Sequence, residues 1–351
     1  MNFPREIEER FIQKTTSILQ SLQKMDAINK KLLLVFDKKT FIGVLSIGDI
    51  QKAIIQNISF DTQVKLIMRK EYVYSNAADS KTEVLELMKK HRIECMPVLN
   101  EQKELLSAYL WNDVFDNEIA NTEVNLMLPV IIMAGGNGLR LRPLTNVIPK
   151  PLIPIGELTI IETIMDKFCE VGCNKFYISV NYKAEIIRYY LSSLNHQKYH
   201  IEYIQEDIPL GTAGSLHLLK GKLNTTFFVS NCDIIIEQDI SDILEYHRKY
   251  QNEITVVAAI KNYPIPYGIF DTGDGGKLIS ISEKPDVTFK INTGFYILEP
   301  HLINEIPENE FYHITALIEK LLAENRKVGV FPVSEKSWKD IGEWQEYLKL
   351  I

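Results

Sequence analysis

The sequence contains few cysteines and no long apolar run. Its four cysteines, Cys95, Cys169, Cys173 and Cys232, include no Cys-x-x-Cys pair. This spacing favours free thiols in a reducing compartment over a zinc site or a disulfide framework. No apolar run approaches the length of a membrane span, and the charged N-terminus lacks the apolar core of a signal peptide. We therefore expect a cytoplasmic protein that has no membrane partner.

The sequence also lacks an excess of basic charge. The formal net charge is -7 over 351 residues. An acidic balance of this kind disfavours binding to nucleic acid, although it leaves room for a local basic pocket that holds phosphates. Hydrophobic residues make up 46% of the chain and charged residues 24%, as in ordinary globular proteins. A chain of this length is expected to fold as two domains.

The first third of the chain contains two similar segments. In each segment an amphipathic helix precedes two short apolar strands that are joined by a polar turn, and a further helix follows. A polar stretch at residues 117–125 predicts a linker after the second segment. The expected helices and strands are residues 10–24, 31–36, 41–45, 48–56, 80–91, 95–99, 105–110 and 111–117.

Residues 1–122 resemble a tandem pair of CBS (cystathionine β-synthase) domains, most clearly over residues 43–50. The resemblance implies a regulatory or oligomerisation domain, in which Ser46 and Asp49 hold the ribose and phosphate of an adenine or other nucleotide. In the second copy Leu110 replaces the hydroxyl residue. Ligand sensing and pure scaffolding both remain open, and the resemblance implies a homo-oligomer.

From residue 128 onward, strands alternate with helices. This alternation predicts an α/β domain over residues 128–351, with a Rossmann-like, mixed and mainly parallel sheet, preceded by the α+β tandem CBS pair. Ligands of such folds bind beyond the carboxyl ends of the strands. The expected strands are residues 129–134, 175–180, 201–205 and 226–230, and the expected helices are residues 160–171, 184–194 and 212–220.

A glycine-rich loop follows the first of these strands. Its glycines allow the backbone to approach a ligand closely and to turn N–H groups toward phosphate oxygens. The loop is not a dinucleotide fingerprint, because Leu141 replaces the third glycine, and it is not a Walker loop. Arg140 within the loop and Lys150, which lies between two prolines, are two cations that can meet one polyphosphate.

This stretch resembles the signature of the sugar-phosphate nucleotidyltransferase family, Gly-x-Gly-x-Arg-x-x-Pro-x-Thr followed by Pro-Lys-Pro, and the likeness covers roughly residues 128–351. It implies an enzyme that joins a nucleoside triphosphate to a sugar 1-phosphate and releases pyrophosphate. In that reaction Arg140, Lys150 and Lys284 stabilise charge. The resemblance assigns nucleotide binding in this loop to Ala134, Gly135, Gly136 and Gly138.

A second segment, residues 210–214, is expected to open a helix with free N–H groups, and the resemblance places Gly211 and Thr212 beside the nucleobase. Glu206 and Asp207 precede it. Guanine offers a carboxylate two donors, its N1–H and its N2 amino group, whereas uracil and thymine offer one imide N–H and cytosine has no imide N–H. Glu206 therefore favours GTP. The alternative is that both acids only complement the helix dipole.

Two aspartates and a polar hairpin complete the predicted site. The resemblance assigns Asp233 and Asp340 to Mg²⁺, a hard cation that prefers carboxylate and phosphate oxygens. Cys232 stands where the family usually has glycine. A strand is expected to begin at Asn292. The sugar 1-phosphate is assigned to Gly268, Glu283, Lys284 and Asn292.

Several substrates remain open. A CBS pair ahead of such a domain is similar to the guanylyltransferases that act on glucosamine 1-phosphate in the legionaminic acid route. A mannose-1-phosphate guanylyltransferase and a uridylyl- or thymidylyltransferase for glucose 1-phosphate are alternatives within the class. A non-catalytic nucleotide-sensing subunit is an alternative of another class, which predicts that the charged site residues are missing, whereas this sequence has all of them.

Overall fold

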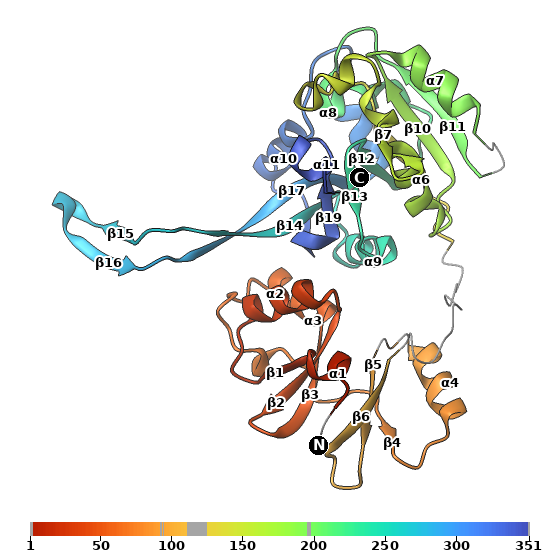
Figure 1. Ribbon diagram of the computed structural model, residues 1–351. Coiled ribbons are helices and arrows are strands. Elements are labelled where there is room, and N and C mark those ends of the chain that lie inside the picture. The colour runs from red at the N-terminus through yellow and green to blue at the C-terminus, as the bar shows by residue number, and fades with distance from the viewer. Residues whose placement is uncertain (1–2, 92, 94, 111–124, 195–197, 350–351) are drawn as a thin grey trace. The chain divides into compact units, whose positions relative to one another are not determined.

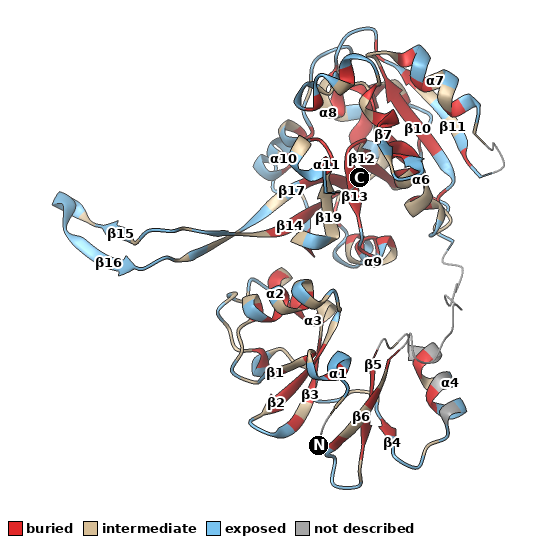
Figure 2. Ribbon diagram, in the orientation of Figure 1, coloured by how far each residue is buried: buried red, intermediate tan, exposed pale blue. Residues whose placement is uncertain are grey.

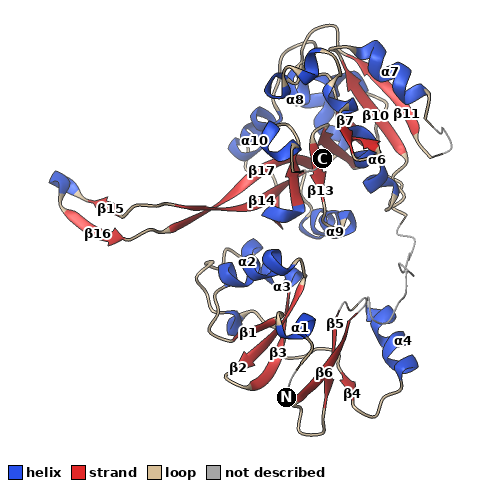
Figure 3. Cartoon of the chain, viewed as in Figure 1, coloured by secondary structure: helices blue, strands red, loops and turns tan. Residues whose placement is uncertain are grey.

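The computed structural model describes residues 3–91, 93, 95–110, 125–194 and 198–349. Contacts divide the chain into two compact units, Met1–Thr122 and Glu123–Ile351 (Figures 1 and 3). The helix predicted at residues 111–117 and nearly all of the predicted linker lie outside the described residues.

The N-terminal unit contains two three-stranded sheets of the same topology. In each sheet the first strand is parallel to the second, and the second is antiparallel to the third. Leu34 and Phe36 of the first sheet share one apolar cluster with Cys95 and Leu99 of the second, so each repeat buries its apolar face against the other. The elements are α1 (Arg5–Glu8), β1 (Phe11–Gln13), α2 (Ile18–Ile28), β2 (Leu32–Asp37), β3 (Thr40–Ser46), α3 (Ile47–Ile55), η1 (Val64–Leu66), β4 (Ser75–Asn76), α4 (Lys81–His91), β5 (Cys95–Leu99) and β6 (Leu105–Leu110).

The first helix begins later than the sequence predicts. A helix is expected over residues 10–24, but β1 occupies the start of this range and α2 begins at Ile18. The side chain of Ser17 accepts from the N–H of Gln20, whose own side chain accepts from the N–H of Ser17. This capping box fixes the start of the helix, and the residues before it pair with β2.

The C-terminal unit is built on a seven-stranded sheet in the order β11-β10-β7-β12-β17-β14-β18. Among these described strands, β17 alone is antiparallel to its neighbours. The predicted mixed, mainly parallel sheet is therefore confirmed. The strands are β7 (Val130–Met133), β10 (Lys175–Val180), β11 (His200–Gln205), β12 (Phe227–Asn231), β14 (Ile254–Pro264), β17 (Asp286–Leu298) and β18 (Val328–Ser334).

Helices cover both faces of this sheet, and its central strands are buried (Figure 2). On β7, Val130 and Ile132 join one apolar cluster, whereas Ile131 joins a second cluster on the opposite face. The first cluster includes side chains of α6 (Ile160–Cys169), α7 (Ala184–Ser192) and α9 (Ile240–Tyr250), and the second includes side chains of η5 (Ser215–Leu219), η7 (Pro300–Glu305) and α10 (Ile314–Ala323). The remaining elements are η2 (Leu139–Leu141), η3 (Leu144–Asn146), η4 (Lys150–Leu152), β8 (Pro154–Ile155), β9 (Leu158–Thr159), α8 (Gly211–Gly214), β13 (Ile234–Ile236), β15 (Ile269–Thr272), η6 (Asp274–Gly276), β16 (Leu278–Ser282), η8 (Glu335–Ser337), β19 (Trp338–Asp340) and α11 (Trp344–Tyr347).

Strands β14 and β17 continue past the edge of the sheet as a two-stranded arm, which ends in the β15–β16 pair (Figure 1). We call residues 261–290 the arm. The sequence predicts that the last strand begins at Asn292, but β17 begins six residues earlier, at Asp286. The reason is visible in the sequence, because Val287, Phe289 and Ile291 alternate with polar residues at the two-residue period of a strand.

In the part of the chain that the structure describes, no helix combines the length and the apolar character needed to cross a bilayer.

Candidate active site

The carboxyl ends of β7, β10, β11 and β12 meet at one edge of the sheet, because these four strands are parallel. The glycine-rich loop follows β7, Glu206 follows β11 and Asp233 lies two residues after β12. From β7 the chain adds β10 and β11 on one side and then crosses to β12 on the other. Open α/β sheets bind their ligands at such a reversal of strand order.

Asp233 and Asp340 lie together at this edge, although they are far apart in the sequence. Strand β13 pairs with β19 so that Ile234 is opposite Asp340, and the N–H of Ile341 donates to the carbonyl of Asp233 at 2.9 Å. We call these two carboxylates the acid pair. Burial, followed by the negative charge of Asp233, raises the pKa of Asp340.

Two cations meet the acid pair. The ammonium group of Lys150 forms an ion pair with Asp233, and the two side chains are only 11% and 9% exposed. The guanidinium of Arg140 lies 3.6 Å from a carboxylate oxygen of Asp233 and 3.6 Å from one of Asp340. One charged cluster thus combines residues from the loop after β7, the Pro-Lys-Pro segment and the β13–β19 pair.

Two residues of this cluster were missed by the sequence analysis. The N–H of Gly342 donates to Asp340 at 2.8 Å, and a Cβ atom at this glycine would lie 2.7 Å from both Arg140 and Asp233. Glu343 accepts a hydrogen bond of 2.8 Å from Arg140. Both residues directly follow the Asp-Ile pair that carries Asp340, and this proximity is the signal that could have found them.

The glycine-rich loop is held open by its own contacts. Gly138 has a φ of 61° and begins η2, and its carbonyl accepts from the hydroxyl of Thr145 at 2.8 Å. A Cβ atom at Gly136 would have no described atom within 4 Å, so the backbone here faces open space. Ala134 is buried at the end of β7 and donates to the carbonyl of Ser179.

Lys183 is a third residue that the sequence analysis missed. Its ammonium group donates to the carbonyl oxygens of Thr145, Asn146 and Val147 at 3.3, 2.6 and 2.9 Å. These carbonyls lie in and directly after η3, between the glycine-rich loop and Lys150. Lys183 therefore positions this segment, and a lysine that begins a helix after β10 gives little signal of such a role in the sequence.

Glu206 is a buried carboxylate beside the glycine-rich loop. It is 6% exposed, and it accepts from the hydroxyl of Ser179 and, at 3.1 Å, from the N–H of Leu210. A Cβ atom at Gly135 would lie 2.9 Å from one of its oxygens. Asp207, in contrast, is exposed. Because its side chain is buried, Glu206 differs from an exposed acid that would only complement the helix dipole.

The helix start at Gly211 and Thr212 is largely engaged within the protein. The N–H groups of Ala213 and Gly214 both donate to the carbonyl of Tyr312 at 3.0 Å. The hydroxyl of Thr212 accepts from the N–H of Ile314 at 3.1 Å. The expectation of free N–H groups at this helix start is therefore wrong for Ala213 and Gly214, because the segment before α10 already accepts from their N–H groups.

The four residues assigned to the sugar 1-phosphate are not brought together within one chain. Asn292 lies in β17 at the carboxyl edge, where its amide donates to the hydroxyl of Tyr296 at 2.9 Å. Gly268 and Glu283 lie together on the arm, since a Cβ atom at the glycine would be 2.7 Å from Glu283. Lys284 follows them and has a φ of 45°.

The separation follows from the length of β17. Asn292 lies six residue positions after Asp286 in this strand, which corresponds to about 20 Å of extended chain. Glu283 and Lys284 lie still farther along the arm. The arm leaves the sheet at the edge that carries the acid pair, because β14 runs in the same direction as β12.

In the N-terminal unit, Ser46 and Asp49 form the capping box of α3. Asp49 is 7% exposed and forms an ion pair of 2.8 Å with Arg69, which also donates to the hydroxyl of Ser46 at 3.1 Å. Both predicted ligand residues are thus engaged with each other and with a cation of the same chain.

Comparison with known proteins identifies the larger unit. Residues 129–351 match the family model described as Nucleotidyl transferase, which is more than half of the chain. The chain belongs to the nucleotidyl transferase family. Residues 64–114 match the model of the CBS domain, which agrees with the resemblance for this part of the N-terminal unit.

Relatives of this nucleotidyl transferase include the mannose-1-phosphate guanyltransferase of Pichia angusta, 34% identical, with 62% of each chain covered. The mannose-1-phosphate guanylyltransferase catalytic subunit beta of Dictyostelium discoideum is 31% identical, with 63% of each chain covered. The chain thus spans less than two thirds of these relatives. The crystal structure of HddC from Yersinia pseudotuberculosis complexed with GMP-PN is similar at a TM-score of 0.50 and 25% identity, covering 64% of this chain and 98% of that one.

The donor set of the nucleotidyl transferase unit fits a magnesium ion that is shared with a substrate. In the described ranges, no group of three or more His, Cys, Asp or Glu side chains is placed to hold a metal. The acid pair supplies two carboxylates, and Mg²⁺ commonly takes its other ligands from phosphates and water. Burial and the nearby charge of Asp233 both disfavour the ionised form of Asp340, and a cation beside the pair would offset this cost.

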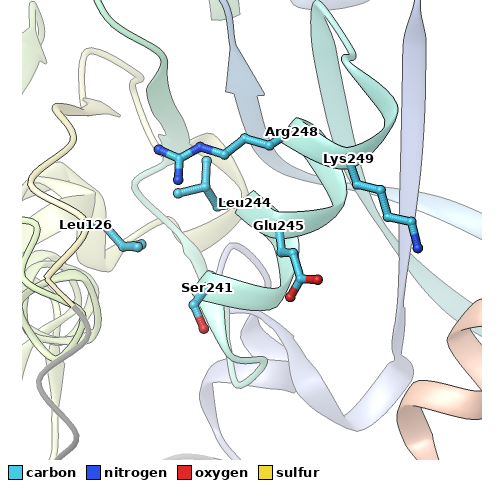
Figure 4. Close-up of a pocket in the computed structure, with 6 residues that line it drawn as sticks. All are labelled: Leu126, Ser241, Leu244, Glu245, Arg248 and Lys249. Atoms are coloured by element: carbon cyan, nitrogen blue, oxygen red, sulfur yellow. The ribbon is translucent and has the colours of Figure 1, made fainter.

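A hollow on α9 lies apart from these residues (Figure 4). Its lining includes Leu126, which stands before the amino end of β7, whereas the acid pair lies at the carboxyl edge. Among the described residues, it is lined by Leu126, Ser241, Leu244, Glu245, Arg248 and Lys249, and none of these is a predicted site residue.

Proposed function

We propose that this chain transfers a nucleotidyl group from a nucleoside triphosphate to a sugar 1-phosphate and releases pyrophosphate, with residues 128–351 as the catalytic domain. One observation carries the proposal. At the carboxyl edge of the sheet, the acid pair meets Arg140 and Lys150 beside an open glycine-rich loop. Transfer of this kind depends mainly on positioned charge, which this cluster supplies.

In the proposed reaction a phosphate oxygen of the sugar 1-phosphate attacks the α-phosphorus, and the bond to pyrophosphate breaks. The attacking oxygen is already ionised near neutral pH, so no general base is needed. Arg140 and Lys150 neutralise the charge that develops on the phosphates. Asp233 and Asp340 would hold Mg²⁺, which would supply further positive charge against that of the phosphates.

We assign GTP as the nucleotide. Glu206 is a buried carboxylate beside the glycine-rich loop, and a carboxylate can pair with both N–H donors on the guanine edge. The names of the relatives, which are guanylyltransferases, support the same base, as does the GMP-PN in the HddC complex.

Glucosamine 1-phosphate is the sugar that we propose, because a CBS domain precedes the catalytic domain as in the guanylyltransferases of the legionaminic acid route. Mannose 1-phosphate is the second candidate, and the names of the relatives favour it. For residues 1–122 we propose a role in regulation or oligomerisation.

The test is pyrophosphate release by the full chain with Mg²⁺, across GTP, UTP, dTTP, CTP and ATP, each with glucosamine, mannose, glucose and N-acetylglucosamine 1-phosphates. We expect a signal with GTP and glucosamine 1-phosphate. A signal with mannose 1-phosphate alone would replace the sugar but keep the reaction. Binding of GTP without turnover of any sugar would instead indicate a nucleotide sensor.

The Asp233→Asn variant is the matched negative control for this assay. We expect it to fold normally and to lose on the order of a hundredfold in rate, because it removes a key charge from the site. Asp239→Asn serves as the comparison, since Asp239 is a cap of α9 outside the cluster and should keep its rate. Normal turnover by Asp233→Asn would overturn the metal assignment.

A further inference from the structure

The arm exposes apolar surface on both of its faces. Every residue from position 261 to position 290 is exposed or only partly buried, whereas residues 254–260 of the same β14 strand are all buried (Figure 2). Leu278 and Ile279 are neighbours in β16, so they point to opposite faces of the ribbon. Six large apolar side chains of the arm are more than half exposed: Tyr267, Phe270, Leu278, Ile279, Ile281 and Phe289.

A ribbon of this kind needs a partner. An isolated pair of strands is at best marginally stable in water, and a third layer or strand is needed to cover its apolar face. Large exposed apolar side chains that gather on one short segment are typical of an interaction site. Since both faces of the arm carry such side chains, the surface that covers them must come from outside the arm.

We propose that the arm packs against a second copy of this chain, and that Glu283 and Lys284, which lie between β16 and β17 about midway along the arm, complete the active site of that copy. Two observations favour a second copy as the partner. The arm contains four lysines and four acidic residues, so its net charge is zero and suits neither nucleic acid nor an anionic membrane. Its 30 residues match the roughly 20–30 residues that one side of a standard interface uses.

The edges of the arm point to contact through its faces. Pro264, Pro266 and Pro285 remove N–H donors along the ribbon where β14 and β17 approach its outer half. Proline on an edge prevents the addition of another strand. Packing of face against face therefore fits the arm better than extension of its sheet, and two identical faces can meet about a two-fold axis.

The second part of the proposal rests on the proposed function. Within one chain, Asn292 borders the end of β12, while Glu283 and Lys284 lie more than about 20 Å along the arm. The arm leaves the sheet at the edge of the acid pair. In a two-fold pair, each arm therefore starts beside its own site and extends toward the equivalent edge of the partner.

Amide hydrogen exchange tests the interface without any assay of activity. We expect the amides of β16 to be protected at high protein concentration and to lose this protection on dilution. The double variant Ile279→Ser/Ile281→Ser should lose the protection at all concentrations, whereas Tyr189→Ser, which changes a side chain that is 81% exposed on α7, should keep it. Exchange of β16 that is fast and independent of concentration in the wild type would overturn the interface.

Mixing two inactive full-length variants tests the shared site. Asp233→Asn has an intact arm, and Glu283→Gln/Lys284→Ala has an intact acid pair. If the arm acts on the partner, each mixed pair contains one complete site, so an equimolar mixture recovers about a quarter of the wild-type rate. If the arm acts within its own chain, the mixture stays as inactive as either variant, and the proposal fails. Inactivity of the wild type with every substrate would instead reject the proposed function, and the exchange experiment would still decide the interface.

Discussion

At the residue scale, Asp340 is expected to lower the stability of the folded protein while it serves the proposed reaction. Burial and the charge of Asp233 raise its pKa, so its ionised form is less favourable in the folded protein than in the unfolded chain. The Asp340→Asn variant should therefore unfold at a higher temperature than the wild type near neutral pH without metal. It should also lose Mg²⁺-dependent activity, because an amide does not replace the carboxylate.

The pH dependence of this effect provides its check. Below the raised pKa of Asp340 the wild-type carboxyl is protonated too, so the stability gained by the variant should shrink as the pH falls from about 8 to about 4. Thermal unfolding in the presence of a chelator measures the difference. Asp239→Asn is the control, and we expect no comparable gain there. A variant that is less stable than the wild type at every pH would contradict the assignment.

Glu206 makes the second prediction at this scale. Glu206→Gln replaces one acceptor oxygen by a donor, which cannot pair with both N–H groups of guanine. We expect kcat/KM for GTP to fall by roughly tenfold or more, as one lost or mismatched polar contact of 1.4 kcal/mol would give, while the smaller rates with UTP change less. Asp207→Asn is the matched control, since this neighbour is exposed. An equal loss with both nucleotides would indicate that Glu206 acts only through its bonds to Ser179 and Leu210.

At the element scale, Lys183 connects α7 to the segment between the glycine-rich loop and Lys150. Its three hydrogen bonds to carbonyl oxygens order η3, so Lys183→Met should loosen this segment. We expect KM for the nucleotide to rise by roughly tenfold with a smaller change in kcat, because the lost contacts shape the binding loop rather than touch the reacting atoms. Lys167→Met, at a pair on the surface of α6, serves as the control. A change in kcat alone would refute this role.

The sequence predicts elements well where the signal is local. The strands at Lys175–Val180 and Leu105–Leu110 end where the pattern places them. The alternation of strands with helices from residue 128 onward suffices to predict the mixed, mainly parallel sheet. The prediction is wrong at residues 10–24, where apolar spacing fits a helix but parallel pairing with β2 makes a strand. That pairing joins residues more than twenty positions apart, so no local pattern reveals it.

In the candidate site, too, local motifs identify residues, whereas contacts between distant parts of the chain are not visible in the sequence. The cations and the acids could be named from motifs, yet the meeting of Asp233 with Asp340 depends on the β13–β19 pair and is not visible in the sequence. The occupied N–H groups of α8 depend on Tyr312, about a hundred positions away. Apolar and polar residues alternate over residues 286–292, which indicates the early start of β17. The strand was instead predicted to begin at the motif that starts with Asn292.

At the scale of the whole molecule, the two units have separate cores. Among the described residues, the apolar clusters of the N-terminal unit contain residues up to Leu110, and those of the other unit contain none before Leu126. We therefore expect two unfolding transitions in calorimetry. Addition of Mg²⁺ and GTP should raise the midpoint temperature of only the transition that belongs to the catalytic unit, since a ligand stabilises the unit that it binds. Equal shifts of both transitions, or a single transition, would contradict the prediction.

The continuity of β14 and β17 into the arm makes its reach adjustable in steps. Two extra residues in each strand would lengthen it by about 7 Å and leave every side chain on its original face. One extra residue would turn all of them over. Two related proteins in one cell whose arms differ in length would each fit only their own kind, so the arm would sort newly made subunits by origin and prevent mixed enzymes from forming.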